Sequence, residues 1–164
     1  MTSRPAAEGA GGTAIRPFAH SLPMRLLRVR EALMQNFRPH LLAHGMSEQQ
    51  WRIVRALAEV ESLEILAISE RCCILPASLS HMLPKLETLG VIARNAHATD
   101  QRRVVVTLTP EGRRLFAEMG AESERIYAGI AQAIGPARLD ALYGLLDEVL
   151  ERLTPPAGGR ATKR

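Results

Sequence analysis

The residues of this chain with the clearest chemistry lie in the polar stretch HATDQRR at positions 97–103. It holds Asp100, Arg102 and Arg103 and runs directly into a β-type stretch, which predicts a strand from Arg103 to Leu108. A second predicted strand, Val91 to Ala96, places residues 97–102 at a hairpin tip. An arginine there packs against nothing in its own chain, but its guanidinium can enter the narrow, negatively charged minor groove of DNA. Two interpretations stand at this point: a DNA-contacting tip, and a solvated turn with surface arginines.

The elements before the hairpin decide between these interpretations. Residues 63–72 predict a short third helix, and residues 76–90 a fourth, with Pro76 in its first turn and Gly90 at its C-terminal cap. Two short helices with a tight turn between them are typical of a helix-turn-helix. A hairpin directly after them indicates a winged helix, whose fourth helix enters the major groove while the hairpin reaches the minor groove. Pro84 lies inside this recognition helix, so we expect a kink, which leaves open which side chains after His81 reach the groove.

Helices flank this core on both sides. Apolar spacing predicts a first helix from about 17 to 42, and Ser47 with Gln50 is typical of the capping box of a second. Thr109 and Pro110 begin a long helix that Gly135 and Pro136 interrupt. The last helix has an apolar stripe at near-heptad spacing that needs a partner, which predicts a homodimer: Leu139, Leu142, Leu146, Val149, Leu150 and Leu153. The expected fold is mainly α with a small β-hairpin wing, that is, a winged helix-turn-helix DNA-binding domain plus a helical dimerisation region.

Composition agrees with a DNA-binding protein without requiring one. The 164 residues are 46% hydrophobic, and 21 basic against 17 acidic residues give a formal charge of +4. No apolar run is long enough to span a bilayer and no secretory signal is visible, so we expect a cytoplasmic protein without a membrane partner. The sequence has no glycine-rich phosphate loop, nucleophile motif or set of metal ligands, and we therefore expect neither an enzyme nor a cofactor.

The cysteines and histidines allow two rival functions. Cys72 and Cys73 are adjacent, which favours free thiols in a reducing compartment but leaves a redox-sensing regulator as an alternative. His40 and His44 have a spacing that could hold a metal, but no acidic or cysteine partner accompanies them. We therefore predict no metal site.

Two ordered motifs carry a resemblance to a known family. LSHMLPKLETLGVIAR followed by TDQRRVVVTLTPEG resembles the MarR family of bacterial transcription regulators over about residues 20–153. The matching residues are Leu86, Glu87, Gly90, Val91, Ile92, Arg94, Asp100, Arg102, Leu108, Thr109 and Gly112. The resemblance implies that Arg102 inserts into the minor groove, held by Asp100, and that Arg94 contacts the sugar-phosphate backbone. The full set of predicted DNA-contacting residues is Pro76, Ala77, Ser78, Ser80, His81, Lys85, Arg94, Asp100, Gln101, Arg102 and Arg103.

A second stretch, REALMQNFRPHLLAHGMSEQQWRIVRALAE, is similar to the HpaR-type branch of this family, which regulates aromatic-acid catabolism. This implies an aromatic or heteroaromatic carboxylate as effector, such as a hydroxyphenylacetate or a hydroxynicotinate-like acid. The positions that match the pocket of salicylate-binding members are Arg28, Arg30, Trp51, Arg55 and His81. Trp51 has the alternative of a core residue, and Arg28 and Arg30 have that of a solvated face or intersubunit salt bridges.

These inferences define a domain plan and a function. We expect a flexible tail at 1–15, a single MarR-type domain at 16–153 and a basic tail at 154–164. The winged helix-turn-helix covers about 47–109, and the dimerisation helices cover about 17–44 and 110–153. The expected function is a ligand-responsive repressor that binds a pseudo-palindromic operator as a homodimer. A constitutive or architectural DNA-binding protein without a ligand is the alternative.

Overall fold

The structure, a computed structural model, describes residues 17–96 and 103–154. The chain divides into two compact units, residues 1–35 and 36–164. In the first unit a 3-10 turn, Phe18–His20, precedes helix α1 (Leu22–Ala43), whose last residues belong to the second unit. The prediction of one helix from about residue 17 was therefore wrong for its beginning. Ser21 is extended, and Pro23, which lacks an N–H, suits the first turn of a helix that begins beside it.

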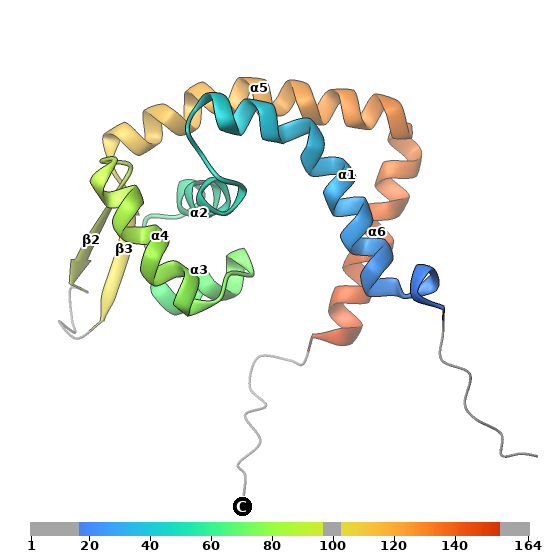
Figure 1. The fold of residues 1–164 in the computed structure, drawn as a ribbon, viewed down its shortest axis with the longest axis horizontal. Coiled ribbons are helices and arrows are strands. Elements are labelled where there is room, and N and C mark those ends of the chain that lie inside the picture. The colour runs from blue at the N-terminus through green and yellow to red at the C-terminus, as the bar shows by residue number, and fades with distance from the viewer. Residues whose placement is uncertain (1–16, 97–102, 155–164) are drawn as a thin grey trace, which may run out of the picture. The chain divides into compact units, whose positions relative to one another are not determined.

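The helices and strands after α1 follow the predicted order. Helices α2 (Glu48–Ala58), α3 (Ile65–Cys72) and α4 (Pro76–Thr88) come before strands β2 (Ile92–Ala96) and β3 (Val104–Leu108). Figure 1 shows α3 and α4 close together, with the β2–β3 hairpin beside α4. The predicted capping box is present at the start of α2: the Ser47 hydroxyl accepts from the Gln50 N–H, and the Gln50 side chain accepts from the Ser47 N–H.

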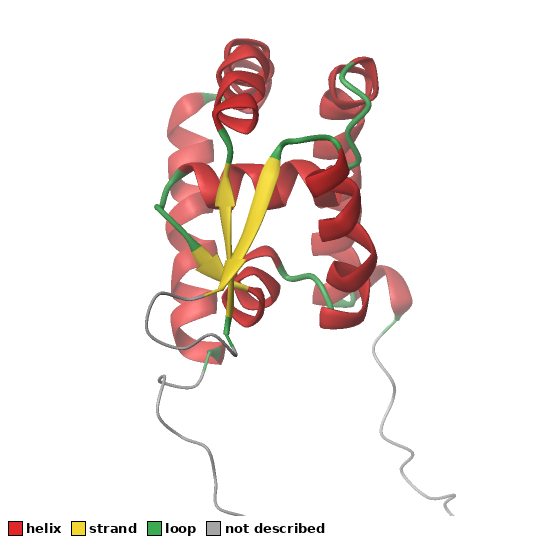
Figure 2. Ribbon diagram, turned by 90° about the vertical axis from the view of Figure 1, so that its left-hand side faces the viewer, coloured by secondary structure: helices red, strands yellow, loops and turns green. Residues whose placement is uncertain are grey.

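A third strand was not expected. Leu63 and Glu64, predicted as the start of the third helix, form strand β1 (Leu63–Glu64), which pairs antiparallel with Val106 and Val105 of β3. The sheet has the order β1-β3-β2, and its strands are drawn in yellow in Figure 2. The central strand β3 offers backbone hydrogen bonds on both edges. Leu63 and Glu64 supply hydrogen-bond partners for the second edge of β3, and this accounts for their extended conformation before α3 begins.

A hydrophobic core joins these helices to the sheet. Helices α2, α3 and α4 and the three-stranded sheet make up the winged part of the chain. Side chains from each of these helices and from two of the strands are 0–2% exposed: Ile53, Val54, Leu57, Ile68, Leu79, Leu83, Leu86, Ile92 and Val106. Burying an aliphatic side chain of this size stabilises a fold by about 1.5–3 kcal/mol. The winged part therefore holds its shape around its own core.

Two long helices complete the second unit. Helix α5 (Pro110–Ile134) begins at Thr109, whose hydroxyl accepts from the Gly112 N–H, and it ends at Gly135, where φ is +93°. Helix α6 (Pro136–Leu153) follows and has no buried residue. The fold prediction, a winged helix-turn-helix with additional long helices, is confirmed.

Candidate functional site

The recognition helix α4 has one buried and one exposed face. Leu79, Leu83 and Leu86 fix its orientation by packing into the core. The residues predicted to contact DNA lie on the other side of the helix: Pro76, Ala77, Ser80, His81 and Lys85 are exposed, and Ser78 is half-buried. Their spacing of three and four residues gives one continuous strip along α4, which is the geometry needed to enter a major groove.

Pro84 lies on the exposed face of α4, and the helix continues past it to Thr88. The missing N–H leaves a carbonyl of the preceding turn on the solvent side, where water can hydrogen bond to it. One turn later the Thr88 hydroxyl donates to the Pro84 carbonyl at 2.9 Å. Lys85 thus remains on the same helix as His81, while the expected kink remains a prediction.

The turn between α3 and α4 is held by hydrogen bonds to its backbone. Cys73 has a positive φ of 49°, and the Ser69 hydroxyl donates to the Ile74 carbonyl at 2.6 Å. Beside this turn Arg52 donates to the Cys72 carbonyl at 2.8 Å, which ties α2 to the end of α3. Cys72 is buried and Cys73 is exposed, and burial raises the pKa of the Cys72 thiol above its ordinary value. Both are free cysteines.

The described parts of the hairpin place two of the predicted arginines. Arg94 on β2 and Arg103 just before β3 are both exposed, and each forms an ion pair with a glutamate of the helix-turn-helix. Ala96 is paired with Val104 at the far end of the hairpin. Asp100, Gln101 and Arg102 lie outside the described residues, so the tip contacts remain predictions.

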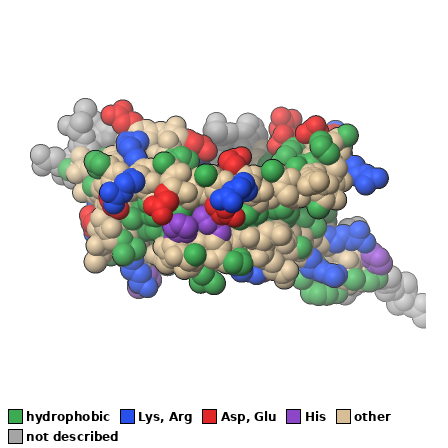
Figure 3. Space-filling model, turned by 90° about the horizontal axis from the view of Figure 1, so that it is seen from above, with side chains coloured by type: hydrophobic (Ala, Val, Ile, Leu, Met, Phe, Trp, Pro, Cys, Tyr) green, Lys and Arg blue, Asp and Glu red, His purple; other side chains and the backbone are tan. Residues whose placement is uncertain are grey.

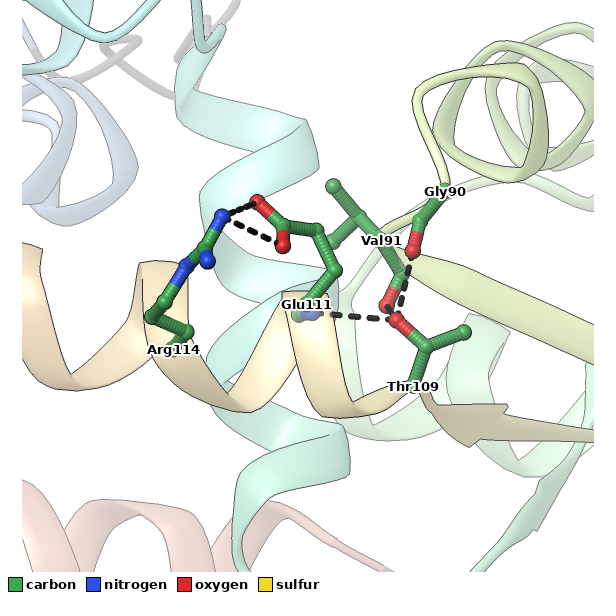
Figure 4. A network of polar contacts seen from close by, with 6 residues as sticks. Gly90, Val91, Thr109, Glu111 and Arg114 are labelled. Carbon is green, nitrogen blue, oxygen red and sulfur yellow. Dashed lines mark hydrogen bonds and ion pairs between the residues drawn. The ribbon is translucent and has the colours of Figure 1, made fainter.

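The junction between the hairpin and α5 explains part of the family-like motif (Figure 4). The Thr109 hydroxyl donates toward the carbonyls of Gly90 (2.5 Å) and Val91 (3.1 Å), and the Thr109 N–H donates to the Val91 carbonyl at 3.2 Å. Gly112 is buried against the same segment: a Cβ there would lie 2.0 Å from the Val91 oxygen. Thr109 and Gly112 thus join the first turn of α5 to the start of β2.

The residues predicted for an effector fall in three places. Trp51 and Arg55 are one turn apart on α2, and His81 lies on the exposed strip of α4. Arg28 and Arg30 belong to the first unit, where Arg30 forms an ion pair with Glu31 at 2.9 Å.

The contacts of Trp51 and Arg55 lead to α5. Trp51 is buried and its indole stacks on the ring of Phe116 at 5.9 Å. Arg55 is exposed, donates to the Tyr127 hydroxyl at 2.7 Å and lies 5.6 Å from the centre of the Tyr127 ring. The Tyr127 ring also contacts Phe37 at a centroid distance of 4.8 Å. A cation, a hydroxyl and an aromatic ring thus meet where Arg55 of α2, Tyr127 of α5 and Phe37 of α1 contact one another, and Trp51 and Phe116 form a second contact between α2 and α5.

Tyr127 is the residue of this group that the sequence reasoning missed. Its signal was helical spacing: Phe116, Met119, Ser123 and Tyr127 are three or four residues apart, and Met119 and Ser123 are buried. One stripe of α5 therefore faces the rest of the unit and brings Tyr127 with it.

His40, in the last turn of α1, and His44, just after that helix, both contact backbone carbonyls, and His44 Nε2 also lies 3.6 Å from a carboxylate oxygen of Glu118. His40 Nε2 lies 3.1 Å from the Met119 carbonyl oxygen and His44 Nδ1 lies 3.0 Å from that of His40, so each of these nitrogens donates. Histidine side chains gather with acidic and basic side chains on the face in Figure 3. Within the described residues no group of three or more His, Cys, Asp or Glu side chains could hold a metal ion. Among these same residues, no helix combines the length and apolar character that crossing a membrane requires.

The helix pair, the hairpin beside α4 and the small three-stranded sheet define a winged helix-turn-helix protein. Residues 46–104 match the model of the MarR family. The chain is 40% identical over 129 residues to the HTH-type transcriptional regulator FarR of Neisseria gonorrhoeae, covering 79% of this chain and 88% of FarR. It is 38% identical over 130 residues to the homoprotocatechuate degradative operon repressor of Escherichia coli, with the same two coverages. The chain therefore belongs to the MarR family of transcription regulators.

A solved structure agrees with this assignment. The crystal structure of NadR in complex with 4-hydroxyphenylacetate is similar with a TM-score of 0.74 and 37% identity, covering 80% of this chain and 96% of NadR. The predicted resemblance to the MarR family and its HpaR-type branch is confirmed by these relatives, which are regulators rather than enzymes.

Proposed function

We propose that the chain is a ligand-responsive repressor that binds a pseudo-palindromic operator as a homodimer. The observation that carries the proposal is the exposed strip of α4 beside an arginine-bearing hairpin. A helix of this kind reads base edges in the major groove, and nearby basic side chains position it on phosphates. The predicted DNA contacts are those listed above, with Arg102 entering the minor groove.

The homodimer is supported by the apolar side chains of α6. Six of them are 37–75% exposed in the single chain: Leu142, Tyr143, Leu145, Val149, Leu150 and Leu153. An exposed stripe of this extent on one helix calls for a covering surface. A two-fold dimer covers it with the same helix of a second copy and presents two recognition helices to two half-sites.

The effector we propose is a small aromatic carboxylate that binds at Arg55. A guanidinium donates two parallel hydrogen bonds to a carboxylate, and the Tyr127 hydroxyl holds this one at 2.7 Å while remaining able to donate to the ligand. NadR, in its complex with 4-hydroxyphenylacetate, and the E. coli repressor of homoprotocatechuate degradation support this class of ligand. Trp51 provides part of the aromatic surroundings through its stack on Phe116. Arg28, Arg30 and His81 are the other residues predicted for the effector, and they stay predictions.

The proposed mechanism is a shift between two dimer states. The acid must prefer the state in which the two wings no longer fit the operator, and a tenfold loss of DNA affinity needs about 1.4 kcal/mol of coupling. Thermodynamic reciprocity then requires the operator to weaken acid binding by the same factor.

A thermal-shift screen of hydroxyphenylacetates, benzoates and hydroxynicotinates against the purified protein tests the ligand class, since a ligand bound only by the native state raises Tm. Calorimetry with the best acid, with and without DNA, then tests the coupling between acid binding and DNA binding.

We expect Arg55→Gln to remove acid binding and Tyr127→Phe to weaken it about fivefold, the loss of one hydrogen bond. Arg71→Gln, which removes another exposed arginine of the same unit, is the matched control. Equal acid affinity with and without DNA would instead indicate a constitutive DNA-binding protein, and DNA release by peroxide alone would indicate sensing through Cys72 and Cys73.

A further inference from the structure

Both strands of the hairpin are connected to the helix-turn-helix by ion pairs. Arg94 on β2 donates from Nε (2.8 Å) and NH2 (2.5 Å) to one carboxylate oxygen of Glu87, in the last turn of α4. Arg103, just before β3, donates from Nε at 3.2 Å and from NH2 to the carboxylate of Glu64, at the start of α3. Two arginines that the sequence suggested as DNA contacts are thus already engaged with protein carboxylates.

The two strands differ in how much else holds them. The central strand β3 pairs on one edge with β1, whose Glu64 leads directly into α3, so its backbone is tied to the helix-turn-helix. Strand β2 is at the edge of the sheet, and within the described residues its strand pairing is with β3 alone. At Arg94, three residues before the start of the tip, the Glu87 ion pair connects this edge strand to α4 through side chains.

The Arg94–Glu87 ion pair is suited to orienting strand β2 rather than to stabilising the fold. The hydrogen bond from Arg94, with its charge, lowers the pKa of Glu87, and Glu87 raises the pKa of Arg94, so both groups are ionised at neutral pH. Exposed ion pairs add little to the free energy of unfolding because water screens them. Two N–H groups of a planar guanidinium on one carboxylate do, however, restrict the direction of both side chains.

We propose that Glu87 is a positioning residue for DNA binding, which acts through Arg94 to fix strand β2 at a set angle to the recognition helix α4. The inference rests on the proposed operator binding. A recognition helix and a wing can enter adjacent grooves at once only if their relative orientation matches the DNA. A wing that is already fixed loses less conformational freedom on binding. A carboxylate near phosphates with no such role would only repel DNA, and its removal would tighten binding.

The test compares Glu87→Gln, Arg94→Gln and the double variant in the full-length chain. The probe is a duplex that the wild-type protein selects from a random-sequence library, titrated at several salt concentrations. We expect Glu87→Gln to weaken DNA binding about fivefold, because the interaction free energy between two residues in direct contact corresponds to a change in affinity of about this size. Its salt dependence stays that of the wild type because no phosphate contact is lost. In the Arg94→Gln background the same substitution has no further effect.

Two more variants separate geometry from charge. Glu87→Asp keeps the charge but shortens the side chain, and we expect it also to weaken binding. Glu59→Gln removes the same charge and breaks the Arg71–Glu59 ion pair away from the hairpin, and we expect no weakening. The proposal is overturned if Glu87→Gln binds as tightly as the wild type or tighter, or if its loss is the same with Arg94 absent. Failure of the wild type to select any duplex would contradict the proposed DNA binding itself and not this role of Glu87.

Discussion

The winged part of the chain and helix α6 treat their apolar side chains in opposite ways. In the winged part, side chains such as Ile53, Leu79 and Val106 are fully buried within the same chain. In α6 no residue is buried, and Leu150 and Leu153 are 61% and 75% exposed. The core of the winged part is thus complete within one chain, whereas the apolar side chains of α6 find no cover among the described residues. The two regions should therefore respond differently to mutation.

Deleting residues 139–164 is the strongest test of this difference. We expect the truncated chain to sediment as a monomer, because the apolar stripe of α6 is lost, while circular dichroism still reports a folded winged part. Within the full-length chain, Leu150→Gln should weaken the dimer, and Glu151→Gln on the same helix should leave it intact. A truncated chain that sediments as a folded dimer contradicts the assignment of α6.

Gly112→Ala tests the junction between the winged part and α5. The added Cβ would lie 2.0 Å from the Val91 carbonyl oxygen, which is backbone and cannot move freely. We expect the free energy of unfolding to fall by roughly 3 kcal/mol, the level of severe overpacking, as measured by urea denaturation.

Gly129→Ala, on the same helix, is the matched control. An added Cβ there meets nothing within 4 Å. Replacing a helical glycine by alanine in open space should stabilise the chain by about 0.5–1 kcal/mol. Equal effects of the two substitutions would show that the close approach to Val91 does not matter.

Arg102→Ala should affect DNA binding alone. We expect operator affinity to fall by about 1–3 kcal/mol, the cost of one groove contact, with Tm and the dimer unchanged. Titration of labelled DNA at moderate salt measures the operator affinity, a melting curve measures Tm, and sedimentation measures the dimer. Unchanged affinity would contradict the role of the hairpin tip.

The two cysteines should differ in reactivity. The exposed Cys73 should react first with a thiolate-selective reagent at pH 7–8, whereas burial both shields Cys72 and keeps its thiol protonated. In the unfolded chain Cys72 ionises near pH 9.0, and in the folded chain above it. The unfolded state thus loses its proton first, so the free energy of unfolding should decline as the pH rises above about 9. A Cys72→Ser variant that keeps the same decline would contradict this cause.

Local signals in the sequence predicted most of the fold. The Ser47 capping box, Thr109 at the start of α5 and Gly135 at its end act through hydrogen bonds within a few residues, so the sequence displays them directly. Strand β1 was missed because Leu63 and Glu64 are extended by pairing with Val106 and Val105, about forty residues away. A two-residue strand has no periodicity of its own.

The candidate site was predictable to a similar extent. The strip on α4 follows from helical spacing, and the described structure places those residues on one exposed face. Tyr127 could not be linked to Arg55 from the sequence because α2 and α5 meet only through the tertiary fold. The ion pair of Arg103 was missed for the same reason, since Glu64 precedes Arg103 by 39 residues. The ion pair of Arg94 spans only seven residues, but it crosses the turn from α4 into β2, where helical spacing no longer predicts which side chains meet.

Helix α5 follows strand β3 almost without a loop, so a change in the direction of α5 is passed directly to the hairpin. A single residue, Thr109, separates the strand from the helix, and its N–H and hydroxyl are bound to the segment that starts β2. At 1.5 Å per residue, the 25 residues of α5 form a rod about 37 Å long. A rotation of about 5° about one end of such a rod displaces the other by roughly 3 Å. Because Thr109 is hydrogen-bonded to Gly90 and Val91, we expect such a tilt to be passed to both strands of the hairpin together.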